Sequence, residues 1–342
     1  MNRSVKKERV IYFDILNIFA CFAVLALHHN GIVHNFNVNT DTWKQALAFE
    51  VVFYWAVPIF FMLSGATLLN YRDKYSTMEF FSKRVWRAVF PFILWSIVLL
   101  FHAYVVGNFS YKNLQDIINA IINTSLPYGN VYWFFIPLIA LYFITPVLSL
   151  LKDNQIILWY MIIFIFITHS CLPLIFKWLG LKYNFALSFP MMGYTLFFLL
   201  GWVVSNWNFS RWQRYIIYLL GGGSAIIRYF GTLHFSLVNG KIDKFLFGYM
   251  HFHSVLLALA VFVFVKYTFI DSKHSKLISL LSSCSLGIYL IHKLVMHYEL
   301  KLLNLTEDNI YWRFLGAFLT YIVCLCIVLL IKKLPYIRNV FP

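Results

Sequence analysis

Apolar runs of about 20 residues recur along the whole 342-residue chain, and this feature excludes most folds. A helix of that length crosses the ~30 Å hydrocarbon core of a membrane. The composition agrees, because 61% of the residues are hydrophobic and only 12% are charged, too few for the surface of a soluble protein. The alternating pattern of an outer-membrane barrel is absent from the sequence. We therefore expect an all-α, polytopic membrane protein.

About ten transmembrane helices are predicted from these runs. Their approximate bounds are 10–30, 46–69, 86–106, 131–151, 156–176, 187–205, 214–230, 246–266, 278–297 and 312–334. A shorter stretch, 112–124, has apolar residues at helical spacing and is expected to lie at the membrane interface. No loop is long enough to fold alone, so residues 1–342 are expected to form a single integral-membrane domain.

Basic residues favour one side of the predicted bundle. The loops on that side and the chain ends hold eighteen Lys and Arg, whereas the opposite side holds ten. The positive-inside rule then predicts that both termini are cytoplasmic. The net charge of +15 is explained by anionic lipid at the bilayer surface, so nucleic acid is not expected as a partner. The five cysteines lie in apolar segments without metal-site spacing, and no metal is expected.

Histidine is unevenly distributed in this topology. Ten of the eleven histidines, all except His274, fall in the outer half or the outer loops. Either they favour the interface as amphipathic side chains, or a subset meets at an outward-facing site. His28 is the sharpest case, because it lies about 27 Å along the first span, where a neutral imidazole can act as a general base. Glu50 is predicted at a similar depth, either as a carboxylate that orients His28 or as a solvated residue at a helix end.

Polar residues of the inner half form two further groups on the first two spans. Asp14 and Asn17 lie one turn apart and share a helix face, too far from His28 for direct contact. Ser64 and Gly65 end an apolar run, and a Ser–Gly pair permits close backbone approach. Helix packing and ligand contact are equally compatible with that pair.

Arg84 and Arg87 enter the third span from the predicted cytoplasmic side. Arginines three residues apart on one helix face can bind phosphate groups. The positive-inside rule also predicts a basic loop at this place, so lipid contact is the alternative. The triple glycine at 221–223 lacks the residues of a phosphate loop and is expected to bend or thin its span.

Five segments, taken in order and at their spacing, resemble the acyltransferase 3 family of membrane proteins. They are 12–17 with Ala20 and His28, 57–65, 84–87 with Pro91, 133–135 with Tyr142 and Pro146, and 285–292. The segments match the family's D-x-x-R…H opening, its FF-x-x-SG motif and its R-x-x-R motif, among others. Together they cover nearly the whole chain.

The resemblance implies a bundle of ten helices that moves an acyl group from cytoplasmic acyl-CoA to an extracytoplasmic glycan or lipid-linked sugar. The layout is most similar to stand-alone surface-polysaccharide O-acetyltransferases, such as the enterobacterial common antigen O-acetyltransferase. Acetyl-CoA is then the expected donor substrate, and no permanently bound cofactor is implied. A multi-pass location in the cell membrane and association with other envelope polysaccharide-assembly proteins are also implied.

The resemblance assigns roles residue by residue. His28 matches the family's essential histidine, and Glu50 is the candidate that would orient it. Arg84 and Arg87 match the motif that meets the CoA moiety. The other expected substrate-binding residues are Ser64, Asn17, Asp14, Trp133, Tyr142 and His292.

One position departs from the family pattern. The family carries an arginine eleven residues before the essential histidine, and this chain has Asn17 there. Asparagine can form hydrogen bonds but cannot neutralise a phosphate. A membrane transporter or exporter of a polysaccharide or small solute, without catalysis, is therefore the alternative function.

Overall fold

The computed structural model describes residues 10–35, 37, 40–108, 111, 113–270, 273, 275–335 and 340–341. Within these ranges all regular secondary structure is helical, as expected. Several residues used above to predict orientation lie outside the described part. They are Arg3, Lys6, Lys7, Arg9, Lys112 and Arg338, and the one predicted inner histidine, His274, lies outside it as well.

Nine helical units in the described residues are long and apolar enough to cross a membrane. Five of them are single helices: α1 (Ile11–His29), α11 (Arg211–Asn239), α12 (Phe252–Phe269), α13 (Lys276–Leu303) and α14 (Ile310–Lys333). The first of the other four joins α2 (Asp41–Phe53), α3 (Ala56–Leu68) and η2 (Tyr71–Asp73). The second joins α4 (Thr77–Arg84), the π-helical η3 (Val85–Val89) and α5 (Phe90–Val105).

The remaining two long units also change helix type along their length. One joins η4 (Asn130–Phe134), α7 (Phe135–Leu148) and η5 (Ser149–Leu151). The other joins α8 (Gln155–Ile165), the π-helical η6 (Phe166–Cys171) and α9 (Leu172–Trp178). Short helices between the long units are η1 (Gly31–His34), α6 (Leu114–Ile122) and η7 (Phe185–Leu187). The predicted interfacial helix corresponds to α6.

Pro58 explains where the second predicted span is interrupted. The α-helical pattern breaks at Tyr54 and Trp55, and Pro58 follows three residues later, in the first turn of α3. Proline has no backbone N–H, so Pro58 cannot donate to the carbonyl of Tyr54 four residues earlier. The chain therefore restarts the helix as α3 instead of continuing α2.

The predicted span 187–205 is shorter in the structure, where the helix that forms most of it, α10 (Thr195–Asn206), begins only at Thr195. Pro190 and Gly193 precede it in an irregular segment. Ten of its twelve residues, from Thr195 to Val204, are buried. Its C-terminal end is held by Lys266, whose Nζ donates to the carbonyls of Val204, Ser205 and Trp207.

Two glycines let α10 lie directly against α3. A Cβ atom at Gly65 would fall 1.7 Å from the carbonyl oxygen of Phe198, and one at Gly201 would fall 1.8 Å from that of Met62. Only glycine permits such a close approach of two backbones. By contrast, the triple glycine does not interrupt α11, and only its first member, Gly221, packs closely on α12.

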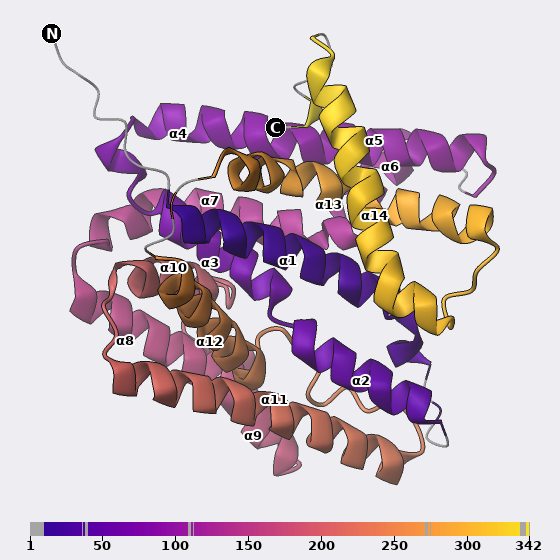
Figure 1. The fold of residues 1–342 in the computed structure, drawn as a ribbon. Coiled ribbons are helices and arrows are strands. Elements are labelled where there is room, and N and C mark those ends of the chain that lie inside the picture. The colour runs from indigo at the N-terminus through magenta and orange to yellow at the C-terminus, as the bar shows by residue number, and fades with distance from the viewer. Residues whose placement is uncertain are drawn as a thin grey trace, which may run out of the picture.

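Helix α1 runs through the middle of the bundle (Figure 1). It contacts α2, α3, α12, α13 and α14, which come from both ends of the chain. Twelve of its nineteen residues are buried. A central helix surrounded in this way presents its side chains to internal spaces between its neighbours.

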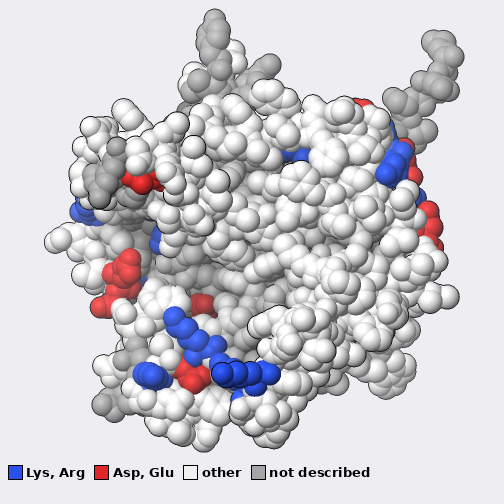
Figure 2. Space-filling model, turned by 180° about the vertical axis from the view of Figure 1, so that it is seen from behind, with Lys and Arg blue, Asp and Glu red and all other residues white. Residues whose placement is uncertain are grey.

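Charged side chains gather toward the two ends of the molecule. Figure 2 shows a broad belt of uncharged surface between them and a hollow with charged residues on its rim. Many large apolar side chains are exposed, among them Phe101, Phe143 and Trp212. An exposed apolar belt of this kind is typical of a surface that faces lipid.

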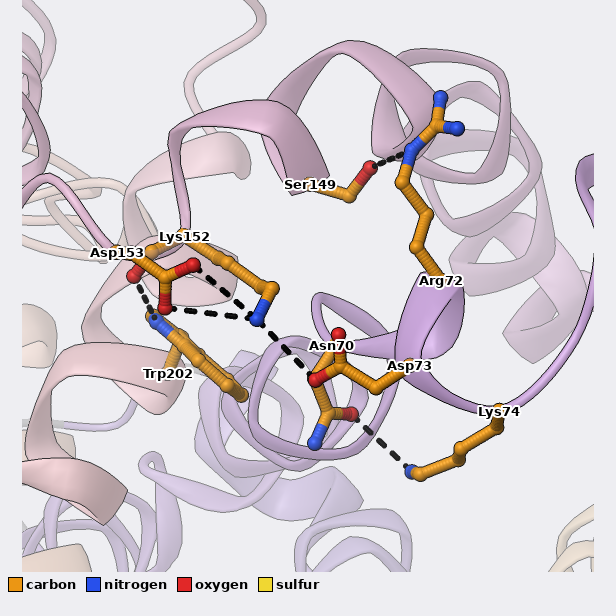
Figure 3. A network of polar contacts seen from close by, with 8 residues as sticks. All are labelled: Asn70, Arg72, Asp73, Lys74, Ser149, Lys152, Asp153 and Trp202. Atoms are coloured by element: carbon orange, nitrogen blue, oxygen red, sulfur yellow. Dashed lines mark hydrogen bonds and ion pairs between the residues drawn. The ribbon is translucent and has the colours of Figure 1, made fainter.

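At one end of the bundle a polar network joins two turns, at residues 70–74 and 149–153, to helix α10 (Figure 3). Lys152 forms ion pairs with Asp73 and Asp153, at 3.1 and 3.2 Å. Trp202 of α10 donates to the backbone carbonyl of Lys152 at 3.0 Å, and the Nε of Arg72 donates to the Ser149 hydroxyl at 2.8 Å. These contacts hold the chain segments at this end together, and Arg72 and Lys152 are engaged in them.

Candidate active site

A cavity of about 640 Å³ lies beside the N-terminal half of α1. Helices α1, α3, α7 and α13 and the region around η3 contribute to its wall. Six of the ten residues that the sequence analysis selected line this one cavity: Asp14, Asn17, Ser64, Arg84, Arg87 and Tyr142. The structure thus brings together residues that are separated by up to 128 positions in the sequence.

The two arginines lie where helix type changes. Arg84 ends α4 and Arg87 lies in η3, a π-helical turn, and such turns are frequent at functional sites. Arg84 is half-buried between the rings of Phe80 and Tyr142, with its guanidinium carbon 5.7 and 5.9 Å from their centroids. Its Nε is buried and has no hydrogen-bond partner among the described residues. Arg87 is exposed, and both arginines line the cavity, so the pair presents cationic donors to it.

Asn17 has a defined partner at the position where the family carries arginine. Its Nδ2 donates to both the backbone carbonyl and the hydroxyl of Ser282, each at 2.9 Å. Asp14, one turn earlier, accepts a hydrogen bond from Ser279 at 3.4 Å. Both residues therefore join α1 to α13 along the wall of the cavity.

Ser64 and Gly65 lie in different surroundings. Ser64 lines the cavity, and its hydroxyl donates to the carbonyl of Phe60 at 2.8 Å. Gly65, the next residue, points in another direction and packs on Phe198 of α10. Ligand contact is thus open to Ser64, whereas Gly65 serves helix packing.

A second, much smaller cavity of about 50 Å³ lies further along α1, and we call it the histidine chamber. Its wall consists of His28 together with Val24, Leu27, Val57, Val131, Trp133, Tyr249 and Tyr289. Val24, Val57 and Tyr289 line the large cavity as well. The two spaces are therefore neighbours, separated by these three side chains. Along α1 the distance from Asn17 to His28 is roughly 16 Å.

Aromatic rings support the chamber on the side away from α1. Tyr249 stacks on Tyr54 with ring centroids 4.3 Å apart and on Trp133 at 5.7 Å. The guanidinium carbon of Arg228 lies 3.4 Å from the Tyr54 ring centroid and extends the stack. The Tyr289 hydroxyl donates to the carbonyl of Val131 and is fixed by that bond.

His292 lies beside His28, although 264 positions separate them in the sequence. The ring centroids are 5.2 Å apart. The Nδ1 of His292 is 2.6 Å from the carbonyl of Tyr289, so this nitrogen is the donor and carries the hydrogen. Its Nε2 is buried without a hydrogen-bond partner in the described part of the chain. The pair therefore places an unused acceptor next to His28.

Glu50 is not placed as either interpretation predicted. It is 6% exposed, so it is not a solvated residue at a helix end. Its carboxylate accepts a hydrogen bond from Asn30 at 3.4 Å and interacts electrostatically with Arg228. No hydrogen bond among described residues joins it to His28. Glu50 thus belongs to the polar layer behind the aromatic stack.

Three residues near His28 were missed as site residues. Tyr249 lies in a loop and gave no signal in the sequence, and Tyr289 lies within the matched segment 285–292 without a role of its own. Lys293 acts electrostatically on His28 and His292. Its position directly after His292, within an apolar span, was a usable signal, because a lysine there is rare and usually functional.

Cationic donors line one cavity and a histidine lines the neighbouring chamber, an arrangement compatible with a membrane-embedded transferase. The comparison with protein families agrees: a family model described as an acyltransferase domain matches residues 10–329. The chain belongs to the acyltransferase 3 family and is a multi-pass membrane acyltransferase. No curated protein matches it significantly. No solved structure does so either.

Proposed function

We propose that the protein transfers an acetyl group from cytoplasmic acetyl-CoA to a hydroxyl of a cell-surface or lipid-linked polysaccharide. The observation that carries this proposal is the shared wall of Val24, Val57 and Tyr289 between the large cavity and the histidine chamber. One extended thioester would then reach from the arginines to His28.

The donor end of the proposed site is the region of Arg84 and Arg87. Guanidinium groups bind phosphates through paired, charge-assisted hydrogen bonds. Neither guanidinium has a carboxylate ion-pair partner among the described residues. The CoA phosphates would stay with these arginines while the acyl end reaches toward Val57. Under the positive-inside rule this end faces the cytoplasm, where acyl-CoA is found.

The chamber favours a small acyl group. Its volume of about 50 Å³ has room for only a few atoms, since one water needs roughly 10–15 Å³ by this measure. An acetyl group fits that limit. A succinyl group is more than twice as large and brings a carboxylate, and no lysine or arginine is among the described residues that line the chamber.

His28 would supply the chemistry at the chamber. Its imidazole takes the proton of the acceptor hydroxyl, and the oxygen attacks the thioester carbonyl. The tetrahedral intermediate expels CoA as a thiolate, which takes the proton back from the His28 imidazolium, and the acyl group stays bonded to the acceptor oxygen. The candidates Ser64 and Tyr142 lie with Arg84 in the large cavity, so they support donor binding better than oxyanion stabilisation.

The first test measures donor binding without any acceptor. Thermal unfolding of the purified protein is followed with CoA and acetyl-CoA, for wild type, Arg84→Ala/Arg87→Ala and the exposed control Arg211→Ala. Ligand at a hundred times its dissociation constant stabilises by about 2.7 kcal/mol. We expect a shift in wild type and the control that the double variant loses. No shift at millimolar ligand would contradict the donor site.

The second test measures transfer. Vesicles that contain the protein are loaded with acetyl-CoA, and CoA release and acetylated glycan are measured. His28→Ala should abolish both, whereas the exposed outer histidine variant His234→Ala should retain them. Full activity of His28→Ala would exclude this mechanism. Flux of glycan or solute without acyl-CoA would favour the transporter alternative.

A further inference from the structure

A chain of hydrogen-bonded side chains begins at His29, in the same turn of α1 as His28 but on another side of the helix. His29 is the next residue, and successive residues of a helix point about 100° apart. Its ring is 0% exposed and lies 4.4 Å, between centroids, from Trp312 of α14. A Cβ atom at Gly316 would fall 2.6 Å from the Cδ2 of His29, so the glycine makes room for the ring.

Three buried side chains are connected there by hydrogen bonds. The Nδ1 of His29 is 2.8 Å from the carbonyl of Leu25, and its Nε2 is 3.0 Å from the Thr320 hydroxyl. The same hydroxyl is hydrogen-bonded to the Oε2 of Glu299. Thr320 is 0% exposed and Glu299 is 7% exposed. The chain thus links α1, α14 and α13.

Counting hydrogens limits the charge states of this chain. The carbonyl of Leu25 only accepts, so Nδ1 of His29 carries a hydrogen. If His29 is neutral, its Nε2 accepts the single hydrogen of Thr320, and the Thr320 oxygen must then accept one from Glu299. Glu299 is protonated in that arrangement. The alternative is a cationic His29 that donates to Thr320, which in turn donates to a Glu299 carboxylate.

The surroundings favour the uncharged arrangement. The second carboxyl oxygen of Glu299, Oε1, is buried and has no partner among the described residues. A carboxylate with a bare buried oxygen is far more costly than a neutral acid in the same place. Lys293 also acts electrostatically on His29, so a second positive charge there would be repelled. Cys324 interacts electrostatically with Glu299 and is also buried, but a cysteine supplies no positive charge.

We propose that His29, Thr320 and a protonated Glu299 form an uncharged hydrogen-bond chain that positions the turn of α1 carrying His28. The three residues are positioning residues, because their chain lies behind the turn while His28 faces His292 and the chamber. The chain fixes the end of α1 against α13 and α14 without placing a net charge beside the reacting histidine.

The protonation state is tested by infrared spectroscopy of the purified full-length protein, independently of any substrate. We expect a protonated carboxyl C=O band at neutral pH that Glu299→Gln removes and that Glu50→Gln, at the other buried glutamate, leaves in place. The amide of Gln can still donate to Thr320, so Glu299→Gln should unfold at nearly the wild-type temperature. If Glu299→Gln removes a carboxylate band instead, the chain is ionic and the proposal is wrong.

The positioning role rests on the proposed function and is tested with Thr320→Val and Thr320→Ser in the vesicle assay. Valine breaks the chain and should lower kcat about 10–100-fold, with little change in KM for acetyl-CoA. Serine keeps the hydroxyl and should restore most of the rate. Retained CoA-dependent thermal stabilisation shows that Thr320→Val is folded.

The outcomes separate the two proposals. Equal rates for valine, serine and wild type would overturn the positioning role. If the wild type transfers no acyl group from any donor, the proposed function fails. The infrared result then decides by itself whether the uncharged chain exists.

Discussion

At the scale of single residues, Asn17 is the position where this chain departs from its family, and its contacts suggest why it is tolerated. The Nδ2 of Asn17 donates two hydrogen bonds, one to the carbonyl and one to the hydroxyl of Ser282. We predict that Asn17→Asp destabilises the protein by at least ~1 kcal/mol more than Asn17→Ala, because an aspartate would face the Ser282 carbonyl without a hydrogen to donate. Thermal unfolding in detergent measures this difference. Equal stability of the two variants would contradict the repulsion expected between the aspartate and the Ser282 carbonyl.

Val57 is the residue that best tests the size of the histidine chamber. It is 8% exposed and belongs to both cavities. Val57→Ala removes two methyl groups from the shared wall, so we expect propionyl-CoA and butyryl-CoA to be used better relative to acetyl-CoA. Leu138→Ala, which enlarges only the large cavity, is the matched control. Release of CoA from each donor is measured, and an unchanged donor preference in Val57→Ala would contradict the size limit.

At the scale of helices, the crossing of α3 and α10 depends on glycine. A Cβ at Gly201 would lie 1.8 Å from the carbonyl oxygen of Met62, and this atom belongs to rigid helix backbone. Gly201→Ala must force the two helices apart and should cost about 3 kcal/mol or more. Gly222→Ala, in open space within α11, should be neutral or slightly stabilising. Thermal unfolding compares the two, and similar midpoints would contradict the packing argument.

The sequence predicts most of the helices, because a membrane span needs a long apolar run wherever it lies. Residues that interrupt helices, such as Pro58, can also be recognised in the sequence. The sequence did not show that α10 would be only twelve residues long. Contacts between residues on different helices, in contrast, could not be predicted from the sequence. The contact of His28 with His292, and the chain from His29 to Glu299, depend on how α1 packs against α13 and α14. Hydropathy does not specify which face of one helix meets which face of another, so these neighbours emerged only from the structure.

At the scale of the whole molecule, the proposed function requires the arginines and the histidine chamber to face opposite compartments. The bias of Lys and Arg predicts that the loop before Arg84 is cytoplasmic and that the loop at Lys182 is outside. In a variant that lacks the five native cysteines, Met78→Cys and Lys182→Cys each introduce one thiol at an exposed position.

A membrane-impermeant thiol reagent added to intact cells should label Lys182→Cys and should label Met78→Cys only after the membrane is opened. The permeant form of the reagent controls for accessibility of each thiol. The reverse pattern would place Arg84 and Arg87 on the outer side, where acyl-CoA is absent. Such a result would leave the family assignment intact but remove cytoplasmic acetyl-CoA as the donor, because the phosphate-binding end of the cavity would then open away from it.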